Sequence, residues 1–127
     1  MRIPVFVSCP TALNRNQEAS RERIMRELGR LQLEPRALGR SDYPADCPLR
    51  EVYVIANHCS GGIILGFHQF TATAGVWKRG TKGQKRIRSS QPVHFPSPWN
   101  HLEAGILFGV QLPLLIFREE PLIRRGL

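Results

Sequence analysis

The stretch Gly61-Gly62-Ile63-Ile64-Leu65-Gly66-Phe67 decides the fold of this 127-residue chain. A short, unbroken apolar run bounded by glycines is typical of a strand that is buried on both faces of a sheet. The segment before it, Pro48–Cys59, is ambiguous, because Val52-Tyr53-Val54-Ile55 looks like a strand while apolar residues also recur at helical spacing. We predict a helix there, since Gly61-Gly62 ends it and two consecutive strands would break the alternating order of the chain.

The rest of the chain continues this alternation. Further strands are predicted at Ile3–Ser8, Leu33–Leu38 and Leu112–Phe117, and further helices at Asn14–Leu31 and from Pro98 to about Val110. Apolar strands separated by amphipathic helices indicate a mainly parallel sheet with helices on both faces. We therefore predict an α/β fold, a flavodoxin- or Rossmann-like three-layer sandwich with about four strands, in one domain of residues 1–127.

The composition indicates a folded protein without a membrane span. Hydrophobic residues make up 42% of the chain, and the apolar stretches Gly62–Phe67 and Gly105–Phe117 are short or interrupted. No signal peptide is visible at the start of the sequence. The cysteines, Cys9, Cys47 and Cys59, form no CxxC pair. We expect a cytoplasmic protein with reduced cysteines and no membrane partner.

A long segment, residues 68–96, looks irregular and strongly basic. Much of the formal net charge of +8 lies in Lys78, Arg79, Lys82, Lys85, Arg86 and Arg88. Loops of this length inside compact domains are usually functional or mobile. A solvated basic loop is one interpretation, and a surface for nucleic acid, a phosphorylated ligand or an acidic partner is the other. No aromatic residue lies between Lys78 and Arg88, which weakens a single-strand stacking model.

Glu103 is the most unusual residue of the last predicted helix. Ser97 suits the N-cap and Pro98 suits the first helical position. At about 100° per residue, one side of the helix carries Trp99, Leu102, Glu103, Ile106, Leu107 and Val110. A carboxylate within such an apolar stripe costs free energy unless it is paired, hydrogen-bonded or used in chemistry. Capping of a neighbouring backbone group, or an ion pair with a core arginine, explains Glu103 equally well.

The predicted topology places Glu103 where ligands bind. Open parallel sheets bind ligands beyond the carboxyl ends of their strands. Four segments are expected to meet there: Ser8–Thr11, Gly39–Asp42, the loop after Phe67, and the start of the Glu103 helix. The first strand is followed by no GxGxxG motif, and the chain has no Walker loop.

The other candidate chemistry is weaker. The histidines, which are His58, His68, His94 and His101, lack metal-ligand spacing, so no metal site is predicted. Cys9 follows the first strand, and we interpret it as a small buried thiol rather than as a nucleophile.

Two family resemblances concern the same stretch. Trp99-Asn100-His101-Leu102-Glu103 resembles the tryptophan-x-x-x-glutamate motif of TIR domains that cleave NAD. Glu103-Ala104-Gly105, Gly109 and Leu112-Pro113-Leu114-Leu115-Ile116 are similar to the nucleoside 2-deoxyribosyltransferase family, in which a catalytic glutamate helix leads into a glycine-x-proline-hydrophobic strand. Both families have flavodoxin-like sheets and use the glutamate at an N-glycosidic bond. The matching residues all lie within Ser97–Phe117.

The resemblance implies a hydrolase that cleaves the N-glycosidic bond of NAD or a related nucleotide, in bacterial antiviral defence or signalling. Glu103 would be catalytic, substrate would contact Trp99, Asn100, Ser8 and Asp42, and phosphates would be steered by Lys78, Arg79 and Lys82. The roles of Ser8 and Asp42 rest on their predicted positions alone and not on a motif match. NAD would be a substrate, with no permanently bound cofactor, and the domain would act as a homo-oligomer.

The chain also departs from both families. The deoxyribosyltransferases carry an aspartate in the loop before the glutamate helix, whereas Asn100 stands near that place and no aspartate follows Asp46. A typical TIR domain has a fifth strand and a last helix beyond the segments predicted here. Three alternatives therefore stay open: a nucleotide sensor without turnover, a nucleoside 2-deoxyribosyltransferase, and a nucleic-acid-binding protein that uses the basic loop. We rank the nucleic-acid-binding protein third, after the hydrolase and the sensor.

Overall fold

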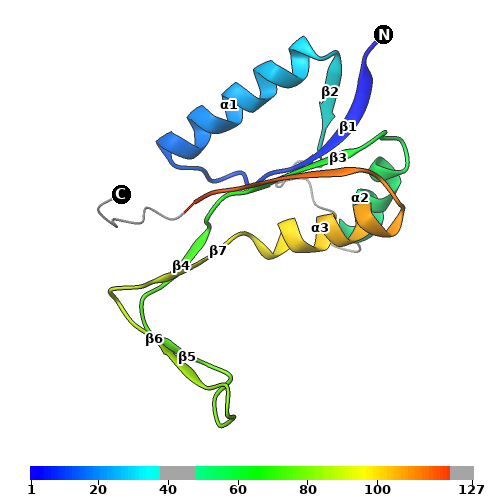
Figure 1. Ribbon diagram of the computed structural model, residues 1–127. Helices are drawn as coiled ribbons and strands as arrows, with labels where there is room; N and C mark the ends of the chain where they lie inside the picture. The colour runs from blue at the N-terminus through cyan, green and yellow to red at the C-terminus, as the bar shows by residue number, and fades with distance from the viewer. Residues whose placement is uncertain (38–47, 121–127) are drawn as a thin grey trace.

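The computed structural model describes residues 1–37 and 48–120 (Figure 1). It is an α/β structure with three helices among these residues. The elements are β1 (Ile3–Ser8), α1 (Arg15–Arg30), β2 (Leu33–Arg36), α2 (Pro48–Ala56), β3 (Gly62–Gly66), β4 (Phe70–Ala72), β5 (Gly75–Trp77), β6 (Lys85–Ile87), β7 (Val93–Phe95), α3 (Pro98–Gly109) and β8 (Leu114–Arg118). The alternating order and the helix at Pro48 are confirmed.

The central sheet has four parallel strands in the order β2-β1-β3-β8. From β1 the chain moves outward to β2, and it then crosses back to place β3 on the other side of β1. The strand order therefore reverses between β1 and β3, as in flavodoxin-like sheets. The predicted fold class is confirmed, and the reversal identifies the part of the sheet edge where ligands bind in such folds.

Helices cover both faces of the sheet. Helix α1 lies on one face, and α2 and α3 lie on the other (Figure 1). Successive side chains of β1 point to opposite faces. Val5 and Val7 therefore pack against Leu28 of α1, while Phe6 packs with Val52 of α2 and Leu107 of α3. No described helix is long and apolar enough to cross a membrane.

Side-chain caps begin two of the helices, and the cap at Ser97 was predicted from the sequence. At α1, Asn14 Oδ1 accepts a hydrogen bond from Gln17 N at 2.8 Å, and Gln17 Oε1 accepts one from Asn14 N at 3.0 Å. At α3, Ser97 Oγ accepts a hydrogen bond from Trp99 N at 3.1 Å, and Pro98 occupies the first turn. These caps satisfy backbone N–H groups that have no partner within a helix.

The buried face of α3 differs from the predicted stripe. The fully buried residues are Asn100, Glu103 and Leu107, whereas Leu102 is 44% exposed. The prediction for Leu102 was wrong because Asn100, a polar residue, takes the position facing the sheet one turn before Glu103. The helix is therefore rotated away from the orientation that apolar periodicity alone suggests.

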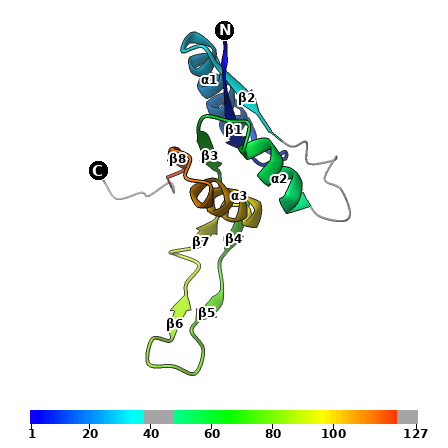
Figure 2. The ribbon, with the colours of Figure 1, turned by 90° about the vertical axis from the view of Figure 1, so that its right-hand side faces the viewer.

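Residues 68–96 are also more regular than predicted. Strands β4 and β7 pair antiparallel, as do β5 and β6 further out, and together they form a hairpin that projects from the sheet (Figures 1 and 2). We call this hairpin, Phe70–Phe95, the arm. Each strand has only three residues, so no alternating pattern was long enough to indicate it. The prediction of an irregular loop was wrong, while its basic character is a property of the sequence.

Gly62 provides a test of the packing between β3 and α3. A Cβ atom at Gly62 would lie 2.7 Å from Leu107 Cδ1 and 3.0 Å from Leu114 Cδ2. Because Leu107 is fully buried and has little room to move, we expect Gly62→Ala to lower the free energy of unfolding by about 1–3 kcal/mol. Urea denaturation measures this change. Gly105→Ala in α3 is the control, because an added Cβ there would meet no atom of the described residues within 4 Å apart from its own helix backbone and chain neighbours, and it should raise stability by about 0.5–1 kcal/mol. Equal effects would refute the packing argument.

Candidate functional site

A buried polar cluster joins β1 to α3 and consists of Ser8, Asn100 and Glu103. Ser8 Oγ donates a hydrogen bond to Glu103 Oε1 at 2.5 Å. Asn100 Nδ2 donates to Ser8 Oγ at 2.8 Å and to the Ser8 carbonyl oxygen at 3.3 Å. The three residues are 0%, 1% and 0% exposed, respectively. We refer to them as the Ser8 cluster.

The fold brings these residues together from distant parts of the chain. Ser8 is the last residue of β1, and its side chain points to the same face of the sheet as that of Phe6, toward α3. Asn100 and Glu103 are three residues apart on α3 and so share one face of the helix. The cluster therefore lies at the carboxyl end of β1, beside the reversal of strand order.

The hydrogen bonds have a defined direction. A carbonyl oxygen only accepts, so the contact with the Ser8 carbonyl requires that Asn100 presents its NH₂ group to Ser8. Ser8 Oγ accepts from that NH₂ group and has one proton of its own, which it donates to Glu103. Such a chain of hydrogen bonds is mutually reinforcing, because each donor polarises the next. The result is a relay from Asn100 through Ser8 to the Glu103 carboxylate.

One acceptor in the cluster is unsatisfied. Among the described residues, no donor lies within hydrogen-bonding distance of Asn100 Oδ1, although this atom is buried. An unpaired buried acceptor costs about 1–3 kcal/mol. Asn100 is held in this orientation by its contacts with Ser8, so the amide cannot turn to relieve the cost. An unpaired acceptor at a sheet edge of this kind is suited to a ligand that carries a hydroxyl or N–H donor.

The other predicted site residues are distributed differently. Trp99 is partly buried on α3, next to Asn100 in sequence. Lys78, Arg79 and Lys82 belong to the turn between β5 and β6, at the end of the arm that is far from the sheet (Figures 1 and 2). The structure does not bring these three cations to the Ser8 cluster, because paired strands hold the turn away from it. Asp42 lies outside the described residues.

A second polar network was not anticipated from the sequence. Glu119 Oε1 accepts hydrogen bonds from Gln17 Nε2 and from the backbone N–H of His68, both at 2.8 Å. Gln17 Nε2 also donates to the His68 carbonyl oxygen at 3.0 Å. This network ties the start of α1 to the ends of β3 and β8. Gln17 could be recognised only as a capping residue, since its contacts span more than fifty positions.

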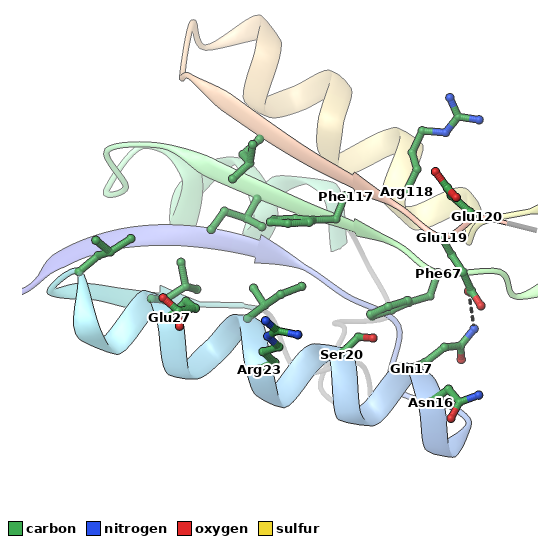
Figure 3. A pocket seen from close by; sticks show the side chains of 15 residues that line it. Asn16, Gln17, Ser20, Arg23, Glu27, Phe67, Phe117, Arg118, Glu119 and Glu120 are labelled. Carbon is green, nitrogen blue, oxygen red and sulfur yellow. Dashed lines mark hydrogen bonds between the residues drawn. The ribbon is translucent and has the colours of Figure 1, made fainter.

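Next to this network is an apolar groove of about 600 Å³ between α1 and β8 (Figure 3). Its floor includes Ile63 and Phe67, and Leu115 and Phe117 of β8 form one wall. The groove lies on the α1 face of the sheet, whereas Glu103 lies on the α3 face. It is therefore separate from the Ser8 cluster.

The described residues include two cysteines, Cys9 and Cys59. Within the described part of the chain, no three His, Cys, Asp or Glu side chains are grouped closely enough to hold a metal ion. Cys59 is a buried free thiol. Burial raises the pKa of the Cys59 thiol, and the charge of Arg36 opposes this effect. A raised pKa reduces the thiolate fraction near neutral pH, which makes Cys59 a poor nucleophile.

No family model matches the sequence, and no curated protein matches it. The resemblance to TIR domains and deoxyribosyltransferases therefore rests on the residues of Ser97–Phe117 alone.

Ser8→Ala tests the energetic role of the cluster. The substitution removes the donor to Glu103 and the acceptor from Asn100, and it leaves both groups buried with one partner fewer. We expect the free energy of unfolding to fall by about 1–3 kcal/mol. Chemical denaturation measures it, with Ser20→Ala at an exposed position of α1 as the control, where the change should stay within about 0.5 kcal/mol. A Ser8 variant as stable as the Ser20 variant would contradict the relay.

Proposed function

We propose that this protein binds a nucleotide at the carboxyl edge of its sheet and cleaves the N-glycosidic bond, with NAD as the expected substrate. The observation that carries the proposal is the Ser8 cluster, a buried carboxylate held by a directed relay beside an unpaired acceptor. Its position at the reversal of strand order agrees with ligand binding in this class of fold. The resemblance of Trp99–Glu103 to NAD-cleaving domains is the reason for proposing the N-glycosidic bond as the bond that is cleaved.

The proposed mechanism assigns each residue a task. Breaking the bond between ribose and nicotinamide develops positive charge on the sugar, and the Glu103 carboxylate stabilises that charge. Ser8 holds the carboxylate in place through its hydroxyl group. Asn100 Oδ1 accepts a hydrogen bond from a ribose hydroxyl, and Trp99 packs against the nicotinamide or the ribose. Water then captures the sugar, so the products are nicotinamide and ADP-ribose.

Burial of the cluster sets a condition on this mechanism. Ser8 and Glu103 are fully buried, so a substrate reaches them only if part of the surrounding structure moves. The unpaired Asn100 Oδ1 also supports a second candidate function, which is a module that senses a nucleotide without turning it over and that needs the same movement, because Asn100 is 1% exposed. In that case Glu103 and Ser8 would brace Asn100 as a recognition group.

The proposed setting is bacterial defence or signalling in the cytoplasm, with the protein acting as a homo-oligomer. One feature of the structure supports assembly. The edge strand β8 exposes Leu115, Ile116 and Phe117, and an exposed apolar edge strand is suited to pairing with another chain.

Glu103→Gln tests the hydrolase directly. The amide keeps the shape of the side chain but removes the negative charge that stabilises the sugar cation. We expect release of nicotinamide from NAD to fall by about 100-fold or more, as measured by chromatography. Glu22→Gln at an exposed position of α1 removes the same charge and should keep the wild-type rate. Unfolding midpoints show whether both variants are folded. A Glu103 variant that releases nicotinamide at the wild-type rate would refute the mechanism.

Calorimetric titration with NAD distinguishes the enzyme from the sensor. The two functions share one site, so Trp99→Ala should weaken binding about 10-fold, because a stacked ring contributes roughly 1–3 kcal/mol. Trp77→Ala, on the arm, is the matched control and should leave the affinity unchanged. If NAD binds in a manner that depends on Trp99 but no nicotinamide is released, the result would refute the hydrolase and support the sensor.

A further inference from the structure

The arm carries an unbalanced positive charge. Residues 68–96 contain six of the 18 basic residues and none of the ten acidic residues of the chain. The remaining residues therefore hold 12 basic and ten acidic side chains, which is close to balance. All six basic side chains of the arm are exposed. The excess charge of the protein is thus concentrated on one projecting element, and the function proposed for the Ser8 cluster does not use it.

The end of the arm is an ordered turn. Thr81 donates to the Lys78 carbonyl oxygen twice, from its backbone N–H at 3.1 Å and from its hydroxyl at 2.7 Å. Gly80 N donates to Gln84 Oε1 at 2.8 Å. Lys78 has φ 50° and Gly80 has φ 80°, so the chain reverses through left-handed residues. These contacts fix the backbone that presents Lys78, Arg79 and Lys82, which lowers the entropy lost when the turn binds a partner.

Aromatic contacts hold the arm together behind the turn. Phe95 packs against Trp77, with ring centroids 5.8 Å apart, and against Phe70 at 6.3 Å. The rings of His68 and His94 stack at 4.4 Å. A hairpin of two short strands is marginally stable alone, and such cross-strand pairs add stability.

The basic side chains lie on both faces of the ribbon. In the β5–β6 register Val76 is opposite Arg86 and Trp77 is opposite Lys85. Since side chains alternate along a strand, Arg86 and Arg88 lie on one face and Lys85 lies on the other. A ribbon with cations on both faces and at its end is suited to a groove with negative charge on both walls, rather than to a flat surface.

We propose that the arm is a binding element for double-stranded DNA, in which the β5–β6 ribbon enters the major groove and its lysine and arginine side chains contact phosphates on both sides. The major groove of B-form DNA admits a two-stranded ribbon. The major groove of duplex RNA is too deep and narrow for side chains to read. This inference does not depend on Glu103 or on the proposed cleavage of NAD.

Other anionic partners fit the arm less well. Amphipathic elements that bind a membrane surface add apolar side chains that enter the lipid to their basic residues, and the turn Lys78–Gln84 contains no apolar side chain. Interfaces with proteins have an apolar centre that is poor in lysine. The turn consists of polar, charged and glycine residues alone, which is the composition of a phosphate-binding surface.

Fluorescence anisotropy with a short labelled DNA duplex tests the proposal on the full chain. We expect a dissociation constant of about 10⁻⁶–10⁻⁴ M near physiological salt. The logarithm of the binding constant should fall with the logarithm of the salt concentration, with a slope of roughly −4 to −5 for four to six phosphate contacts. Absence of binding, or binding that is insensitive to salt, would overturn the proposal.

Two matched triple variants distinguish the effect of the arm on DNA binding from the effect of net charge. Lys82→Gln, Arg86→Gln and Arg88→Gln together should weaken binding at least about 10-fold and make the salt slope shallower by about 2–3. The control combines Arg15→Gln, Arg23→Gln and Arg26→Gln, which are exposed residues of α1, and it removes the same charge. The control should keep both the affinity within about 3-fold and the slope.

Three outcomes would contradict the proposal. Equal loss of DNA binding in the two triple variants would show that binding depends on the net charge of the protein and not on the arm. Arm-dependent binding to duplex RNA as tight as to duplex DNA would refute the major-groove geometry. Arm-dependent binding to vesicles that contain phosphatidylserine, tighter than to DNA, would assign the arm to a membrane surface. Unfolding midpoints for both variants establish that the compared proteins are folded.

Discussion

Strands β1 and β3 are buried on both faces, and the rest of the structure depends on this requirement. Such strands are stable in a parallel sheet only when helices cover both of its faces. Helix α1 follows β1 on one face, and α2 follows β2 on the other. This change of face accompanies the return of the chain across β1 and the reversal of strand order beside Ser8.

The Ser8 cluster occupies space that apolar side chains would fill at lower cost. Burial of a carboxylate is unfavourable, and the hydrogen bond from the Ser8 hydroxyl offsets part of that cost. The cluster also contains an unpaired acceptor on Asn100. Polar groups kept in a core at the expense of stability are characteristic of functional sites. The cost is local, because apolar clusters on both faces of the sheet stabilise the surrounding structure.

Charge and chemistry are separated in this protein. The buried carboxylate belongs to α3, and the exposed cations belong to the arm. The arm projects away from the sheet (Figure 2). Because the two features share no described hydrogen bond or ion pair, the proposed nucleotide chemistry and the proposed DNA binding can fail independently.

The sequence by itself determined the α/β class, the helix and strand order, and the burial of Glu103, because apolar periodicity and capping residues act over a few positions. Ser8 was predicted from its place at the end of a strand, but its bond to Glu103 joins positions 95 residues apart. The same limit hid the pairing of the short arm strands and the rotation of α3 that exposes Leu102. Only the tertiary structure decided these features, because contacts between distant segments leave no periodic pattern in either segment.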